Sequence, residues 1–243
     1  KVNGGDYSTS NPGTAGKDLN LEPAWDLLTD CSSVLVAVVD TGVNSNHEDL
    51  RANLWDGGAT YPDHGYNFVD DNTDTTDLNG HGTHVSATIG ASGNNGVGTT
   101  GVCWKARIMA LRVLDASGSG TTADIVDALN FAIAHGVKVV NMSLGQSAED
   151  PAMETALQNA SKAGIVIVVA AGNDGANDDD ADTPTYPCDS TASNLVCVAA
   201  LDQSFKLASF SNYGAKSVDV GAPGTNVLSA YAGTETTITD SFH

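Results

Sequence analysis

Short apolar runs alternate along this chain with segments of helical periodicity. The runs cover residues 35–39, 107–113, 137–142, 165–170 and 195–200, and they are rich in β-branched residues, as expected of strands buried on both faces. Residues 122–135 place apolar side chains on one helical face, 151–163 begin with proline and end before a glycine, and 81–89 follow Asn79-Gly80. These three segments are predicted helices. The alternation predicts an α/β fold in which helices flank both faces of a mostly parallel central β-sheet.

The charge of the chain narrows the classes of partner. Its 243 residues suffice for one large domain, and 30 acidic against 10 basic residues give a net charge of −20 at pH 7. Nucleic acid is excluded as a partner, because phosphate binding needs clusters of Lys and Arg. No apolar stretch reaches the length of a membrane-spanning helix, so no membrane partner is expected. The excess acid fits the solvated surface of a secreted protein, cation binding, or both.

Four cysteines, an even number, fit an oxidising compartment and therefore an extracellular location. Cys188 and Cys197 are nine residues apart around a loop, so a local disulfide is expected there. Cys31 precedes the first apolar run and Cys103 follows a glycine-rich loop, and they could form the second disulfide. Four cysteines allow three connectivities, and free buried thiols are the alternative.

Three polar residues occupy positions where parallel α/β folds bind ligands. Asp40 ends the first apolar run, Asn173 follows the run at 165–170, and His81 begins a predicted helix between two glycines that would let a substrate approach the backbone. Each motif alone is weak. Asp-Thr-Gly also occurs in aspartic proteases, but no second Asp-Thr-Gly or Asp-Ser-Gly is present. Together and in this order, the three residues predict a catalytic site.

The chain resembles the subtilases, the subtilisin-like serine proteases, from about residue 25 to about residue 230. Further matching segments are 46–50, 118–120, 143–145, 186–187, 208–214 and 221–224. The resemblance implies that His81 is the general base and then the general acid, that Asp40 orients its imidazole, and that the Asn173 amide donates to the oxyanion. It therefore implies a secreted serine endopeptidase acting on peptide or protein substrates.

The resemblance also implies where a substrate peptide binds. Two segments would hold an extended peptide by backbone hydrogen bonds, and small residues would line the pocket for the side chain before the scissile bond. The first set is Gly118, Ser119, Gly120, Ser143, Leu144 and Gly145, and the second is Ala170, Ala171 and Gly172. A propeptide or an inhibitor is a further expected occupant of the same cleft.

One or two calcium sites follow from the same resemblance. The first would use the side chains of Asp6, Asp49 and Asn95 and the carbonyls of Gly93, Val97 and Thr99, because calcium prefers many oxygen ligands. The second would use the closely spaced Asp70, Asp71, Asp74 and Asp77, which lack the glycine and glutamate of an EF-hand. A metal-free glycine loop and a solvated acidic loop are the respective alternatives.

The serine that would complete the catalytic set is missing from the sequence. The family motif Gly-Thr-Ser-Met-Ala does not occur in residues 1–243, which we interpret as an incomplete subtilase catalytic domain. The explanations are a nicked protein whose C-terminal fragment, from the same precursor, carries the serine, a truncated chain, or a pseudoenzyme. The first is favoured, because the sheet would otherwise expose an apolar face. A catalytically inert peptide-binding fragment is the alternative function, although binding alone needs none of Asp40, His81 and Asn173.

Overall fold

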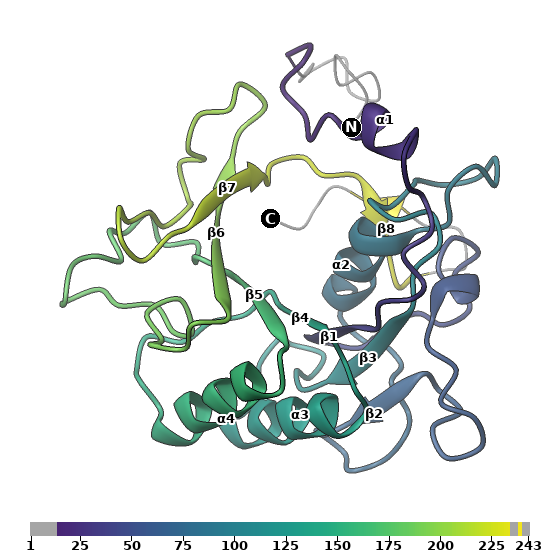
Figure 1. Cartoon of the computed structure of the whole chain (residues 1–243), viewed down its shortest axis with the longest axis horizontal. Helices are drawn as coiled ribbons and strands as arrows, with labels where there is room; N and C mark the ends of the chain where they lie inside the picture. The colour runs from purple at the N-terminus through teal and green to yellow at the C-terminus, as the bar shows by residue number, and fades with distance from the viewer. Residues whose placement is uncertain (1–13, 234–237, 240–243) are drawn as a thin grey trace.

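The computed structural model describes residues 14–233 and 238–239 and is built around a seven-stranded parallel sheet (Figure 1). The strand order is β2-β3-β1-β4-β5-β6-β7. The strands are β1 (Val36–Asp40), β2 (Gly65–Asn67), β3 (Ile108–Arg112), β4 (Val139–Met142), β5 (Val166–Ala170), β6 (Leu195–Leu201) and β7 (Val220–Pro223). From β1 the chain crosses to the edge strand β2 and returns to β3 on one side of β1, and then adds β4 to β7 in chain order on the other side. The carboxyl ends of β1 and β4 thus form the switch point at which such sheets bind ligands.

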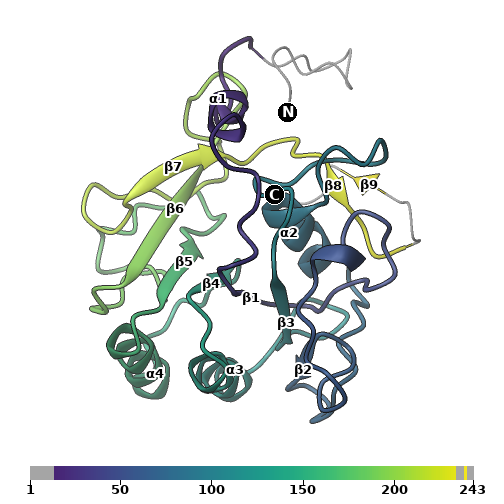
Figure 2. The same cartoon turned by 45° about the vertical axis from the view of Figure 1, so that its right-hand side comes forward.

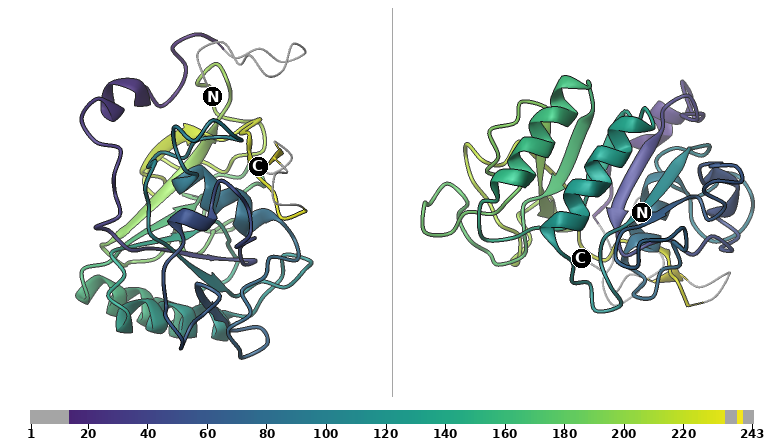
Figure 3. Two further views of the ribbon diagram at one scale, coloured as in Figure 1. Left: turned by 90° about the vertical axis from the view of Figure 1, so that its right-hand side faces the viewer. Right: turned by 90° about the horizontal axis from the view of Figure 1, so that it is seen from below.

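Helices cover both faces of the sheet, as the sequence predicts. They are α1 (Leu21–Trp25), α2 (His81–Gly90), α3 (Thr122–Ala134) and α4 (Pro151–Lys162), with a short 3₁₀ helix at Arg51–Asn53. Helices α3 and α4 lie side by side on one face, and α2 lies on the other (Figure 3). The two-residue strand β8 (Ser229–Ala230), which pairs with β9 (Ile238–Thr239), runs beside α2 (Figure 2). The prediction of an α/β fold with a mostly parallel sheet is confirmed.

Two apolar clusters, one on each side of the sheet, form the core. Neighbouring residues of β1 point to opposite faces, so Val39 belongs to the cluster beneath α3 and α4, whereas Val38 belongs to the cluster beneath α2. Ile125 and Leu129 of α3 complete the first cluster. Burial on both faces explains why β1 and β3 are continuously apolar, whereas β4, β5 and β6 bury alternate residues and leave the others partly or fully exposed.

Helices α3 and α4 begin at side-chain caps. The Thr121 hydroxyl accepts a hydrogen bond from the Asp124 amide, and the Asp150 carboxylate accepts from the amides of Ala152 and Met153. These caps satisfy amide groups that no helical carbonyl reaches. They explain why both helices start where the sequence predicts.

Both expected disulfides are present. Cys31–Cys103, the long-range disulfide, joins residues 72 apart in the chain, and Cys188–Cys197, the local disulfide, joins residues 9 apart. The free-thiol alternative is therefore wrong. Among the described residues, no helix is both long enough and apolar enough to cross a bilayer.

Candidate active site

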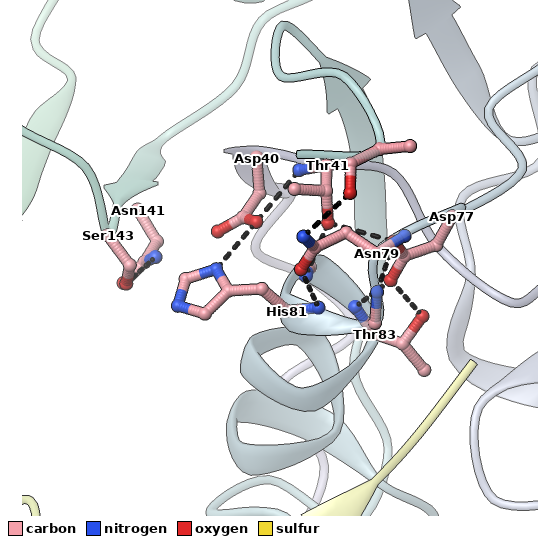
Figure 4. Close-up of polar contacts among 11 residues, drawn as sticks. Asp40, Thr41, Asp77, Asn79, His81, Thr83, Asn141 and Ser143 are labelled. Atoms are coloured by element: carbon pink, nitrogen blue, oxygen red, sulfur yellow. Dashed lines mark hydrogen bonds and ion pairs between the residues drawn. The ribbon is translucent and has the colours of Figure 1, made fainter. Parts of the chain in front are cut away.

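Asp40 and His81, which are 41 residues apart in the chain, meet at the edge of the sheet. Asp40 is the last residue of β1 and is fully buried, and His81 is the first residue of α2. Nδ1 of His81 lies 2.7 Å from Oδ1 of Asp40 (Figure 4). The carboxylate therefore fixes the orientation of the imidazole, with Nε2 on the opposite side of the ring.

The pKa of His81 is raised above its usual value of 6.5 by its surroundings. Burial lowers this pKa, but the hydrogen bond to Asp40 and the negative charges of Asp40 and Asp77 raise it by more. An imidazolium formed here is therefore stabilised by two nearby carboxylates. This suits a histidine that must hold a proton during part of a reaction.

Glycines on both sides of His81 let α2 begin directly against β1. A Cβ on Gly82 would lie 2.3 Å from the carbonyl oxygen of Gly42, and one on Gly80, whose φ is +108°, would lie 2.1 Å from the ring of Tyr231. The sequence suggested that these glycines admit a substrate. The structure shows that they admit other parts of the same chain, which brings His81 to Asp40.

Asp77 is the buried centre of the hydrogen-bond network around the two residues. Its Oδ1 accepts hydrogen bonds from the Thr41 hydroxyl (2.9 Å), the Asn79 amide (3.0 Å) and the Gly80 amide (2.7 Å). Its Oδ2 accepts from the amide (2.9 Å) and the hydroxyl (2.6 Å) of Thr83 (Figure 4). These five donors occupy both oxygens. In the structure Asp77 joins the residue after Asp40 to the start of α2, and its assignment as a metal ligand stays a prediction.

The remaining carboxylates of the second predicted calcium site contact separate partners. Oδ2 of Asp70 accepts from Asn67 (3.0 Å) and lies 3.4 Å from the Arg112 guanidinium. Asp71 accepts from the hydroxyl of Tyr66, and Asp74 from the amide of Thr76. In residues 14–233, no three His, Cys, Asp or Glu side chains gather as a metal site. The negative charges of Asp70, Asp71 and Asp74 are thus partly compensated by Arg112 and by hydrogen-bond donors.

The first predicted calcium site has its main residues close together. Asp49 is fully buried, and its two oxygens accept from the Asn95 side-chain amide and the Thr99 backbone amide, each at 2.7 Å. The loop winds closely around this carboxylate, since a Cβ on Gly98 would lie 1.8 Å from Asp49 Oδ2. A buried carboxylate wrapped by a loop rich in carbonyls fits the oxygen donors that calcium prefers. Asp6 lies outside the described residues.

A cavity of about 360 Å³ opens beside His81 at the carboxyl ends of the strands. Asn173, which follows β5, lines the same cavity, so the three predicted catalytic residues converge. Four predicted substrate-binding residues also line it: Ser143, Ala170, Ala171 and Gly172. Asn141, which the sequence marked only as part of a strand end, lines it as well and donates to the Ser143 hydroxyl (2.9 Å; Figure 4).

The other predicted substrate-binding residues do not line this cavity. They are Gly118, Ser119, Gly120, Leu144 and Gly145. The loop that carries the first three is nevertheless tied to the histidine motif, because the Asn79 side chain donates to the carbonyl of Ala116 (3.1 Å). Gly145 lies against the carbonyl of Tyr186. These segments thus flank the cavity rather than form it.

Comparison with known proteins agrees with this geometry. The subtilase family model matches residues 32–243. A thermophilic serine proteinase of Bacillus sp. (strain AK1) is 42% identical over 210 residues, which cover 86% of this chain and 48% of that protein. Thermitase of Thermoactinomyces vulgaris is 39% identical over 208 residues, covering 86% and 68%. The crystal structure of a cold adapted subtilisin-like serine proteinase superposes with a TM-score of 0.72 at 34% identity, covering 87% and 70%. The chain spans about half of the first relative.

Proposed function

This chain belongs to the subtilase family, and on that premise we propose that it is part of a secreted serine endopeptidase. The observation that carries the proposal is the 2.7 Å contact between His81 and Asp40 at the rim of a cavity shared with Asn173. The attacking serine would lie outside these 243 residues, on a C-terminal fragment of the same precursor. That fragment would place its hydroxyl in the cavity, within reach of His81.

Each residue would act through a defined atom. Nε2 of His81 would take the proton of the serine hydroxyl as the oxygen attacks the peptide carbonyl, and would then give it to the leaving amine. Asp40 would hold the imidazole and stabilise the imidazolium without itself taking the proton. The side-chain amide of Asn173 would donate to the oxyanion of the tetrahedral intermediate. The substrate peptide would run between the segments 118–120 and 143–145, with one side chain in the pocket at 170–172.

Calcium would have a structural part in this enzyme. Asp49, Asn95 and the carbonyls of the loop from Gly93 to Thr99 would hold the ion, with Asp6 as a further ligand. An ion bound only by the folded chain stabilises it by mass action. Asp70, Asp71, Asp74 and Asp77 remain candidates for a second site.

A fluorophosphonate probe tests the proposal, because it labels only an activated serine. The protein would be examined with its C-terminal fragment, and denaturing mass spectrometry would identify the labelled polypeptide. We expect one label on a serine outside residues 1–243, and slow or absent labelling in His81→Ala. In subtilisin, loss of one oxyanion donor lowers turnover roughly 10²–10³-fold, so Asn173→Ala should lower peptide hydrolysis to a similar extent.

The control is Asn194→Ala, which makes the same change at a half-buried asparagine at the opposite end of the sheet. It should leave both labelling and hydrolysis near wild-type values. Absence of labelling and of peptide hydrolysis with both polypeptides present would refute the protease and leave peptide binding as the function of this fold.

A further inference from the structure

Asn212 holds the backbone on both sides of Asn173. It lies in the connection between β6 and β7, 39 residues further along the chain, and it is 1% exposed. Its backbone amide and side chain make four hydrogen bonds to this turn: to the carbonyls of Gly172 (2.9 Å) and Ala171 (3.1 Å), and from the amides of Asp174 (2.9 Å) and Ala176 (3.1 Å). Asn173 itself is exposed and lines the cavity, so its position depends on these buried contacts.

The turn is shaped around this asparagine. Gly172 has a φ of +113°, and a Cβ at this position would lie 2.5 Å from Nδ2 of Asn212. Only glycine combines this backbone conformation with so close an approach. The glycine before Asn173 is therefore required by Asn212 as much as by the turn itself.

A buried carboxylate selects the orientation of the Asn212 amide. Oδ1 of Asp178, which is 4% exposed, accepts from Nδ2 of Asn212 (3.1 Å) and from the Thr185 hydroxyl (3.0 Å). Since the carboxylate and the carbonyl of Ala171 both need a donor, the NH₂ group must face them. The amide oxygen is then left to accept from the two backbone amides beyond Asn173.

We propose that Asn212 is a positioning residue for the oxyanion donor Asn173, and that Asp178 orients Asn212 for this task. The inference rests on the proposed protease function. It adds a buried asparagine–aspartate pair to the site, acting on catalysis through the backbone of residues 171–176 rather than by touching substrate.

The charge state of Asp178 is compatible with this role. Burial raises its pKa to about 6, the nearby charges of Asp189 and Asp174 also raise it, and hydrogen bonds from Thr185 and Asn212 oppose the rise. At pH 8, well above this value, Asp178 is therefore ionised and accepts from Asn212. Oδ2 of Asp178 is buried without a hydrogen-bond partner among the described residues, which is costly for stability. A cost of this kind is common where function rather than stability selects a residue.

The test is a double-mutant cycle between Asn212→Ala and Asn173→Ala, measured as kcat and KM for a peptide substrate at pH 8 in the protein with its C-terminal fragment. Asn212→Ala should lower kcat by about 10-fold or more, less than the roughly 10²–10³-fold loss of the donor itself, with little change in KM. In the Asn173→Ala background the same change should have little further effect on kcat, because the donor it positions is gone. An equal fall in both backgrounds, or a change in KM alone, would overturn the proposal.

Asn194→Ala again serves as the matched control. Its side chain donates to the carbonyl of Ile165, at the far end of β5 from Asn173. A purely structural role for Asn212 predicts that both alanine variants lose stability and neither loses kcat. Asp178→Ala further separates the effect on catalysis from the effect on stability. It should lower kcat about fivefold, which corresponds to the loss of one hydrogen bond, without lowering the free energy of unfolding. Unchanged kcat in this variant would remove Asp178 from the proposal.

Amide hydrogen exchange on the 243-residue chain gives a readout that needs no activity. In Asn212→Ala, or in Asn212→Ser if the alanine variant does not fold, the amides of Asp174 and Ala176 should exchange faster. The amide of Gly175, which donates to the carbonyl of Phe210 (2.7 Å), should change less and is the internal reference. Uniform acceleration of all three amides would contradict the proposal. If the wild type were inactive, the protease proposal would fail, and exchange would decide only whether Asn212 holds the turn that carries Asn173.

Discussion

Asp77→Asn is the substitution that best distinguishes two roles of the Asp77 side chain, as an acceptor of hydrogen bonds and as a calcium ligand. The side chain keeps its shape but loses its charge, and one of its two oxygens becomes an NH₂ group. Oδ1 of Asp77 accepts from three donors, so we expect the remaining oxygen to stay there. The new NH₂ group would then face the amide and hydroxyl of Thr83, which now donate to Oδ2.

The size of the effect follows from these contacts. The Thr83 hydroxyl can rotate and accept, but the backbone amide of Thr83 cannot, and it would be left buried without a partner. An unsatisfied buried donor costs about 1–3 kcal/mol, and loss of a charge-assisted hydrogen bond adds about 1.5–3 kcal/mol. We expect the free energy of unfolding to fall by about 2.5–6 kcal/mol, a large part of the roughly 5–15 kcal/mol typical of a domain.

The assay is urea unfolding of the 243-residue chain followed by tryptophan fluorescence, in excess calcium and in excess EDTA. Asp74→Asn is the control, because it makes the same change three residues away in an exposed carboxylate. Asp77→Asn should lose the same free energy in both buffers, and Asp74→Asn should change stability by less than about 0.5 kcal/mol in EDTA. A destabilisation by Asp77→Asn that disappears in EDTA would refute the reasoning and identify Asp77 as a metal ligand.

Three further predictions concern the disulfides, the histidine and calcium. Replacing both cysteines of the long-range disulfide by serine should lower the free energy of unfolding by about 4.4 kcal/mol, and the same change in the local disulfide should lower it by about 2.6 kcal/mol. The difference arises because a crosslink that closes a longer loop restricts the unfolded chain more. Urea unfolding in the same buffer measures both values, and a reversed order would contradict this account. The imidazole of His81 should titrate above pH 6.5 by NMR, and at a lower pH in Asp40→Asn, where only the charge of Asp77 still opposes the effect of burial; its contribution to stability is thus present below pH 6.5 and is lost as pH rises through the raised value. Excess calcium should raise the melting temperature of the chain relative to EDTA, and Asp49→Asn should abolish the increase; an equal increase in the variant would exclude this site.

The strands that the sequence predicts lie in the interior of the sheet. The run at 35–39 becomes β1 and the run at 165–170 becomes β5, each within one residue at either end. The two strands that it misses lie at the edges of the sheet. β2 has only three residues, including Gly65, and β7 contains two small residues and ends in Pro223. Neither has the apolar continuity that signals burial, and both pair with the sheet because of tertiary context.

The site shows a similar division. The convergence of Asp40, His81 and Asn173 is predictable, because parallel strands end at one edge and two of the residues follow strands directly. The different environments of the Asp74 and Asp77 carboxylates cannot be predicted from the sequence, because both are aspartates in one acidic loop. The backbone of that loop turns one carboxylate to solvent and the other towards Thr41. Likewise, nothing in the sequence near position 212 indicates a contact with residues 171–176.

Catalytic geometry and stability are linked in this site because its carboxylates are buried. A buried charge is unfavourable unless hydrogen-bond donors or an opposite charge surround it. Asp77 has five donors, and Oδ1 of Asp40 contacts both the Thr41 amide (2.8 Å) and His81. The groups that neutralise these two charges are the same groups that place His81, so a change to either carboxylate must alter both folding and chemistry. Ser143 lines the cavity and accepts a hydrogen bond from the half-buried Asn141, and its replacement by alanine should therefore affect substrate binding with little loss of stability.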